Sequence, residues 1–366
     1  MKFFLAFEPR DVIFRSWNPE FDLKTPLKPK PQYVWQVYKP APLDGILVSK
    51  PKIDSKKVMN RLLREGIHRY LDYHAIIFGD CGAFTYVSKD DPPYNPIEVL
   101  AYYDLCGFDY GATVDHLIFP AFFSQKEKRY EVTLRNAELM FREWDGKYRN
   151  GLTLVGVAQG WDVQTYCDAV KRLVEIGFSY VAIGSLARRP SRFILELVRS
   201  IDSMLKDMGS KIKLHLFGVG RINLVDDLAK FRVTSFDTAT ILRQAWLRQR
   251  EGYYLEGETY TAIRIRPEEK AGGELLQKLR LYDNGKLSLE EAMSEIRKIE
   301  NREEWLSLYE RTLREKPWTR CGCKLCEELG IDIAVFRGSE RNMRRGFHNV
   351  WQFYKALKQH LANVAN

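Results

Sequence analysis

Residues 233–246 read VTSFDTATILRQAW, and this stretch decides the fold class of the chain. A short run rich in β-branched and aromatic residues ends on a single carboxylate, Asp237, and a segment containing Arg243 follows. Parallel β/α proteins present catalytic groups in this way, at the carboxyl end of a strand. One such acid decides little, because most acids that follow strands are caps or turn residues. The pattern gains weight because the chain repeats it.

Six apolar runs before residue 233 are followed by helical stretches. The runs are Gly45–Val48, Ala75–Phe78, Tyr110–Val114, Leu152–Ala158, Tyr180–Ile183 and Ile212–Phe217. The helical stretches are Ser55–Glu65, Asn95–Leu105, Gln125–Trp144, Val163–Ile176, Arg192–Met208 and Leu224–Phe231. Continuous apolar strands that alternate with helices indicate a parallel sheet. With MKFFLAF at the amino terminus as an eighth strand, they predict an α/β fold, a (β/α)8 TIM barrel. No Gly-x-Gly-x-x-Gly turn follows the first strand, which disfavours a dinucleotide-binding doubly wound sheet.

Polar and glycine residues stand just past most of these strand ends. They are Asp80, Asp115, Gln159, Gly184, Ser185, Gly218, Gly220 and Asp237. In a closed barrel they converge on one rim, the rim where barrel enzymes keep their sites. Carboxylate and amide side chains there can address the ring donors and acceptors of a purine-like base, and the N–H groups of Gly184 and Ser185 can meet an exocyclic oxygen.

Length and composition bound the rest of the chain. With 366 residues, 45% of them hydrophobic, it can bury a large core. No apolar run reaches the roughly 18 residues of a membrane span, and Glu8, Arg10 and Asp11 cut short the signal-like opening. We therefore expect a soluble, cytoplasmic protein with no membrane contact.

Three regions are predicted. Residues 1–250 form the barrel core and include a Pro-rich segment, Lys24–Gly45, which is expected to lie extended on the surface, pinned by Tyr33, Trp35 and Tyr38. Residues 251–316 form a helical insertion, whose Ser288-Leu289-Glu290-Glu291 is a capping box. Residues 317–366 form a zinc-binding subdomain and a carboxyl-terminal helix.

The metal prediction comes from the clustering of three cysteines. Cys321, Cys323 and Cys326 fall within six residues, and His348 follows. Three thiolates and an imidazole make a closed tetrahedral zinc set of the structural kind, with no open position for water. The predicted cofactor is thus a zinc ion that holds the fold and takes no part in the chemistry.

The charge suits a polyanionic partner. The net charge is +9, from 57 basic and 48 acidic residues. Between Arg311 and Arg345, nine lysines and arginines outnumber five acids, a segment expected to bind nucleic acid.

Five short motifs stand near the strand ends, and the metal motif follows them. They are Asp80-Cys81-Gly82-Ala83-Phe84, Gln159-Gly160-Trp161, Gly184-Ser185-Leu186-Ala187, Phe217-Gly218-Val219-Gly220 and Phe236-Asp237 with Arg243 six residues on. From about Ala75 to His348, these motifs and their order resemble the tRNA-guanine transglycosylase superfamily, which exchanges a guanine in nucleic acid for a 7-deazaguanine. Trp161 and Ser185 replace glycines of the family pattern, and they are expected to change the site near the 7-substituent of the base.

The resemblance implies a role for each motif. Asp237 would be the nucleophile that attacks the anomeric carbon of the sugar, and Asp80 the general acid/base. The remaining matched positions would bind the substrate: Asp115, Gln159, Gly184, Ser185, Phe84 and Arg243. The target nucleotide would have to leave its stack to reach them.

Three features favour DNA over tRNA as the substrate. Residues 251–316 lengthen an interval that tRNA-acting bacterial enzymes keep short. The segment Arg344–Asn349 resembles the DNA-acting branch, often called DpdA. No room follows His348 for the RNA-binding domain typical of archaeal tRNA enzymes. The implied partners are DNA and a free 7-deazaguanine base such as 7-cyano-7-deazaguanine (preQ0), with a helper ATPase and a homodimer as further expectations. The alternatives are a tRNA-guanine transglycosylase and a non-catalytic nucleic-acid-binding subunit.

Overall fold

The computed structural model describes residues 1–17, 19, 30–148, 151–265 and 270–365. The chain divides into two compact units. Unit 1 comprises Met1–Pro9, Leu43–Ala239 and His360–Asn366, and unit 2 comprises Arg10–Pro42 and Thr240–Gln359. The three-region division made from the sequence remains a prediction.

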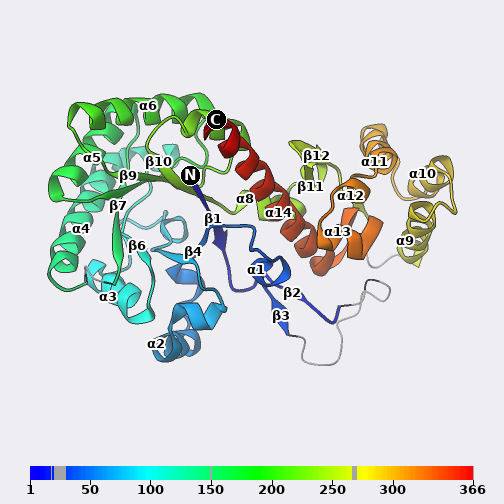
Figure 1. Ribbon diagram of the computed structural model, residues 1–366, viewed down its shortest axis with the longest axis horizontal. Helices are drawn as coiled ribbons and strands as arrows, with labels where there is room; N and C mark the ends of the chain where they lie inside the picture. The colour runs from blue at the N-terminus through cyan, green and yellow to red at the C-terminus, as the bar shows by residue number, and fades with distance from the viewer. Residues whose placement is uncertain (18, 20–29, 149–150, 266–269, 366) are drawn as a thin grey trace. The chain divides into compact units, whose positions relative to one another are not determined.

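Unit 1 is built on a closed barrel of eight parallel strands (Figure 1). The strands are β1 (Lys2–Phe7), β4 (Gly45–Ser49), β5 (Ile76–Asp80), β6 (Tyr110–Ala112), β7 (Thr153–Ala158), β8 (Tyr180–Ile183), β9 (Lys213–Leu216) and β10 (Val233–Thr238). Strand β1 pairs with both β4 and β10 and so closes the barrel. The predicted (β/α)8 barrel is confirmed, including the strand at the amino terminus.

Helices follow the strands and surround the barrel (Figure 1). They are α2 (Lys56–Leu71), α3 (Pro96–Cys106), α4 (Lys126–Lys147), α5 (Val163–Ile176), α6 (Ser191–Asp207) and α7 (Val225–Leu228). Short 3₁₀ turns are η1 (Lys50–Lys52), η2 (Ala83–Thr85), η3 (Pro120–Gln125) and η4 (Ile222–Leu224). Two helix predictions were wrong in extent. Helix α2 continues past Gly66, which takes a φ of 76° at a kink, and the predicted helix 224–231 is reduced to one turn, α7.

Large side chains fill the barrel interior. Phe4, Phe78 and Tyr180 belong to its buried core, and the rings of Phe4 and Phe78 meet edge to face with centroids 6.0 Å apart. Burying an aromatic side chain of this size contributes about 2–3 kcal/mol. A packed interior of this kind fixes the strand ends, and therefore the residues that follow them.

Unit 2 combines helices with three two-stranded sheets. The paired strands are β2 (Ile13–Phe14) with β3 (Pro31–Gln32), β11 (Tyr253–Leu255) with β12 (Glu258–Tyr260), and β13 (Ile263–Arg264) with β14 (Val335–Phe336). The helices are α1 (Val34–Val37), α8 (Thr240–Leu247), α9 (Lys270–Asp283), α10 (Leu289–Arg297), α11 (Glu303–Glu315), α12 (Pro317–Arg320) and α13 (Lys324–Leu329), with 3₁₀ turns η5 (Gln249–Glu251) and η6 (Gly330–Ala334). Helix α14 (Gly338–Ala365) begins in this unit. Helices α9, α10 and α11 pack as neighbours (Figure 1), and the predicted capping box at Ser288 is present.

The Pro-rich segment is only partly extended. Residues 20–29, with Pro26 and Pro29, lie outside the described residues, whereas Val34–Val37 form a helical turn instead of extended chain. The turn forms because its apolar residues are buried and Gln36 accepts from the backbone N–H of Tyr33 at 2.9 Å. Trp35 and Tyr38 are buried as expected of anchoring residues. Among the described helices, none is both long and apolar enough to cross a membrane.

Candidate active site and metal centre

Three of the predicted site residues, together with Cys81, are joined by one hydrogen-bonded network at the strand ends. Asp115 follows β6, Gln159 follows β7 and Ser185 follows β8. Ser185 Oγ donates to Gln159 Oε1 at 2.7 Å, and Gln159 Nε2 donates to Asp115 Oδ2 at 2.6 Å. The thiol of Cys81 donates to Asp115 Oδ1 at 3.1 Å. The network fixes the orientation of the Gln159 amide, so the direction of each donor and acceptor is set before a ligand arrives.

Asp115 in this network and the nearby Asp80 both have raised pKa values. Asp80 is the last residue of β5, and burial, together with the negative charges of Asp115 and Asp237, raises its pKa to about 7 despite a 2.7 Å hydrogen bond from Ser49 Oγ. Burial also raises the pKa of Asp115, although the bonds from Cys81 and Gln159 favour its ionised form. A carboxyl that titrates near neutral pH can both donate and accept a proton, which general acid/base chemistry requires.

The raised pKa of Asp80 predicts a pH-dependent stability. Because the folded protein holds this proton more tightly than the unfolded chain, the stabilisation is complete below about pH 4 and is lost as pH rises through about 7. Between pH 4 and pH 8, the free energy of unfolding of wild type should therefore fall by on the order of 4 kcal/mol relative to that of Asp80→Asn. This follows from about 1.4 kcal/mol for each unit by which the pKa is raised. Thermal unfolding of both proteins across this range measures the difference. Parallel curves would show that Asp80 titrates at its ordinary pKa.

Asp237 is held from two sides at the end of β10. The backbone N–H of Gly218 donates to its Oδ1 at 2.9 Å, and His215 Nε2 lies 3.2 Å from the same oxygen. Gly218 takes a φ of 72°, and a Cβ there would come within 2.8 Å of Ala187 Cβ, so the loop that supplies this N–H needs glycine. The bonds converge on Oδ1 and orient the carboxylate.

Sequence reasoning missed the residues that support Asp237. His215 is fully buried in the barrel against the rings of Phe78 and Phe217, and its Nδ1 lies 2.6 Å from Ser235 Oγ. Ser235 in turn lies 2.5 Å from the hydroxyl of Tyr180. The sequence does carry a signal for these residues. Ser235 and Asp237 are polar residues at alternate positions of β10, and alternate positions of a strand face the same side. His215 is a polar residue flanked by leucines in β9.

Two neighbouring residues shape the loop after β8. A Cβ on Gly184 would approach Gln159 Nε2 to 2.1 Å, so glycine at this position makes room for the amide. Ser185 has a φ of 57°, a left-handed conformation that costs a serine about 1 kcal/mol and a glycine little. This geometry accounts for a second glycine in the family pattern at the Ser185 position.

One expected donor was assigned wrongly. The N–H of Gly184 donates to the carbonyl of Ala158 at 2.9 Å as part of the barrel, so it is not available to an exocyclic oxygen. Tyr166 donates to the carbonyl of Gly184 at 2.9 Å as well. Of the two predicted donors, the N–H of Ser185 has no hydrogen-bond partner within the described part of the chain.

The other two predicted substrate residues are Phe84 and Arg243. Phe84 is in η2, four residues after Asp80, and 57% of it is exposed. Arg243 is on α8, six residues after Asp237, in unit 2 and half-buried. Their roles remain predictions.

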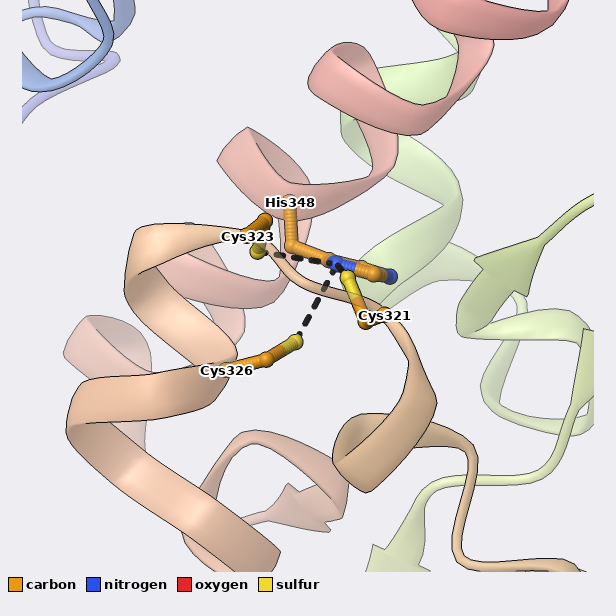
Figure 2. Close-up of side chains that lie close together, drawn as sticks. All are labelled: Cys321, Cys323, Cys326 and His348. Carbon is orange, nitrogen blue, oxygen red and sulfur yellow. Dashed lines mark hydrogen bonds between the residues drawn. The ribbon is translucent and has the colours of Figure 1, made fainter.

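The four predicted metal ligands lie together in unit 2 (Figure 2). His348 Nδ1 is 3.3 Å from the sulfur of Cys321, 3.5 Å from that of Cys323 and 3.3 Å from that of Cys326. A tetrahedral zinc ion with bonds of about 2.3 Å to sulfur and about 2.1 Å to nitrogen would place sulfur and nitrogen roughly 3.6 Å apart. The buried cluster can therefore hold a metal ion, and its donor set and spacing fit zinc.

A second layer of residues orients these ligands. His348 Nε2 lies 2.8 Å from the carbonyl of Tyr254, which turns Nδ1 toward the sulfurs. Each sulfur has one hydrogen-bonding group beside it. Gln352 Nε2 donates to Cys321 at 3.1 Å, Tyr38 OH donates to Cys323 at 3.5 Å, and Tyr253 OH lies 3.2 Å from the sulfur of Cys326. Such partners can orient the sulfurs of a metal site.

The expectation of a basic surface between Arg311 and Arg345 was wrong for the three arginines at the end of this segment. Arg341 and Arg345 are fully buried and Arg344 nearly so. Arg345 donates to the carbonyls of Ile333, Val335 and Ala245, and Arg341 pairs with Asp332. These guanidinium groups tie segments of unit 2 together, so their charges are not available to a phosphate backbone.

A closed parallel barrel with acids, an amide and a titrating carboxyl beyond its strand ends defines an enzyme of the (β/α)8 class. No model of a known protein family matches the chain. Over 88% of its length the chain is 32% identical to the DNA-guanine transglycosylase of Salmonella montevideo, of which the match covers 88%. It is 26% identical over 52% of its length to the tRNA-guanine(15) transglycosylase of Methanothermobacter thermautotrophicus, and 27% identical over 50% to that of Pyrococcus furiosus, covering 29% and 31% of those proteins.

The chain therefore belongs to the guanine transglycosylase family, and it is a glycosyltransferase of the pentosyltransferase type. The resemblance drawn from the short motifs is confirmed at the level of the family.

Proposed function

We propose that this enzyme exchanges a guanine base in DNA for a 7-deazaguanine of the preQ0 type. The observation that carries the proposal is the hydrogen-bonded network of Asp115, Gln159 and Ser185 next to a carboxyl, Asp80, with a pKa near 7. Similarity over most of both chains to a protein named DNA-guanine transglycosylase supports DNA as the substrate. The matches to archaeal tRNA-guanine(15) transglycosylases make tRNA the alternative.

In the first step, an Asp237 oxygen attacks C1′ of the deoxyribose. The C1′–N9 bond breaks, its electron pair goes to N9 of the leaving guanine, and Asp80 supplies the proton for that nitrogen. The product is a glycosyl ester on Asp237 and a free guanine. Gly218 and His215 direct Oδ1 of Asp237, which leaves the other oxygen for the attack.

In the second step, the ionised Asp80 takes the N9 proton from the entering 7-deazaguanine. The electron pair at N9 then forms the new bond to C1′ and displaces Asp237, so the enzyme returns to its starting state. One carboxyl must first donate and then accept a proton, and a pKa of about 7 suits both directions at neutral pH.

Base recognition in this proposal belongs to the network. Each oxygen of Asp115 already accepts one bond and keeps a second lone pair, so the carboxylate can accept from the ring N–H and exocyclic amine of guanine. The N–H of Ser185 is the donor proposed for the exocyclic oxygen. Adenine lacks this arrangement of groups. It would leave the N–H of Ser185 and the second lone pairs of the Asp115 oxygens without partners in a buried place, at a cost of about 1–3 kcal/mol for each unsatisfied group.

The proposed cofactor is one zinc ion held by Cys321, Cys323, Cys326 and His348. Four protein ligands leave no position for water or substrate, so the metal would supply folding energy and no step of the exchange. A helper ATPase that opens the duplex, a homodimer and the cytoplasm as location remain further proposals.

The substrate is tested by incubating the purified protein with radiolabelled guanine or preQ0 and either duplex DNA, DNA with an unpaired guanine, or tRNA. Label should enter DNA, and enter it faster where the guanine is unpaired, because unstacking then costs less. Label found in tRNA and never in DNA would contradict the proposed substrate while leaving the chemistry in place.

A further inference from the structure

Aromatic and basic side chains that are exposed or half-buried follow the candidate base-binding residues in the sequence. Phe119 and Phe123 come four and eight residues after Asp115, Trp161 comes two after Gln159, and Arg188 three after Ser185. Each of these three barrel loops thus carries a residue of the network, followed by an aromatic or a basic residue. Loops that follow neighbouring parallel strands meet at one edge of the barrel.

These side chains contact one another across the loops. The rings of Phe84 and Phe119 have centroids 5.6 Å apart, and the Arg188 guanidinium lies 5.7 Å from the Phe119 ring. Lys126 Nζ lies over two rings, 4.6 Å from Phe123 and 4.7 Å from Trp161. We call Phe119, Phe123, Lys126, Trp161 and Arg188 the rim cluster.

The rim cluster is held in place although Phe123 and Arg188 are exposed. The fully buried Arg129 donates to the carbonyl of Leu117 at 2.7 Å and to that of Val87 at 2.9 Å. One guanidinium therefore ties the loop that carries Phe119 and Phe123 to the loop that follows Phe84. The carbonyl of Trp161 accepts from Arg189 at 3.1 Å. An aromatic ring that is held partly exposed to water gives up part of the free energy that its burial would provide. Binding of a ligand with flat faces would cover the rings and recover that free energy.

The charges of the rim cluster narrow the choice of ligand. Arg188 is exposed, and it forms no ion pair with any of the described residues. Asp80, Asp115 and Asp237 make the adjacent site acidic, so DNA approaching it needs positive charge nearby. Aromatic rings interleaved with cations are typical of surfaces that bind unpaired nucleotides, where bases stack on rings and phosphates meet cations.

We infer that the rim cluster binds the unpaired nucleotides next to the target guanine and so holds the strand open while that base is in the site. The inference rests on the proposed function, since it takes the occupant to be a DNA strand with one base extruded. Phe119 and Trp161 supply stacking faces, and Lys126 and Arg188 supply contacts to the neighbouring phosphates. The surface is independent of base identity and therefore adds affinity without adding sequence specificity.

The test uses a DNA oligonucleotide with 2-aminopurine on either side of a guanine. Phe119→Ala and Trp161→Ala should each weaken binding roughly 5- to 150-fold, the effect of losing one base–aromatic stack. The fluorescence of the stacked 2-aminopurine should change in wild type and not in the variants. In exchange assays, KM for DNA should rise by a similar factor while kcat changes little.

Tyr70→Ala is the matched control, because Tyr70 is half-buried like Phe119 and Trp161, and Arg61 lies 4.9 Å from its ring in another cation–aromatic pair, on α2. Wild-type binding by both rim variants, or an equal loss in the control, would overturn the inference. If wild type exchanges no base but the variants still lose oligonucleotide binding, the proposed function fails and the rim cluster stands. If wild type exchanges and the variants match it, only the rim cluster fails.

Discussion

Asp237→Asn should reduce base exchange by about 10³-fold or more, because the amide cannot form the glycosyl ester on which both steps depend. Asparagine keeps an oxygen that can accept from the Gly218 N–H, so the loop conformation should be preserved. The rate of guanine incorporation into DNA, compared with wild type at equal protein concentration, measures the loss.

Asp168→Asn is the control for this variant. Asp168 is an exposed carboxylate on α5 whose partner, Gln164, can bond equally well to an amide oxygen. Its exchange rate and unfolding temperature should equal those of wild type. Undiminished exchange by Asp237→Asn, with a normal fold, would remove Asp237 from the mechanism.

Cys326→Ser should abolish metal binding and unfold the region around the metal ligands. Structural zinc sites contribute about 10–16 kcal/mol in small domains at neutral pH, so the loss of one thiolate is expected to cost more than about 5 kcal/mol. Elemental analysis should give one zinc per chain for wild type and far less for the variant. Thermal unfolding should show an early transition that wild type lacks.

Cys167→Ser separates this effect from the general cost of replacing a buried thiol. Cys167 is a buried cysteine on α5, away from the metal ligands in sequence, and its replacement should cost about 1 kcal/mol with no loss of zinc. A Cys326→Ser protein that unfolds like Cys167→Ser would show that no metal stabilises this unit.

The barrel could be predicted because its strands are continuous apolar runs, a pattern that few other folds require. Helix ends were harder. The predicted helix ended at Glu65, yet tertiary packing of Ile67 and Leu71 carries α2 beyond it. The turn at Val34–Val37 was missed because prolines on both sides of it favour extended chain, and burial of Trp35 decides otherwise.

Placement of the site could be predicted from chain order, but its hydrogen bonds could not. Strand ends placed Asp115, Gln159 and Ser185 together. Nothing in the sequence shows that the Gly184 N–H is used by the barrel, because that depends on the register of β7 and β8.

The arginines near the carboxyl terminus were misread for a related reason. Charge counts cannot distinguish a surface arginine from one buried against carbonyl groups, as Arg345 is. The acid–imidazole pair of Asp237 and His215 also escaped notice because their separation in sequence hides their adjacency in space.

Detection of the covalent intermediate tests the central claim most directly. Wild-type protein is mixed with guanine-containing DNA without added base, quenched in acid and digested, and the peptide that contains Asp237 is weighed by mass spectrometry. The proposed chemistry predicts a nucleotide-sized mass increase on Asp237, absent from Asp237→Asn and reversed when guanine is added before quenching. A peptide that remains unmodified while exchange proceeds at its normal rate would contradict a glycosyl ester at Asp237.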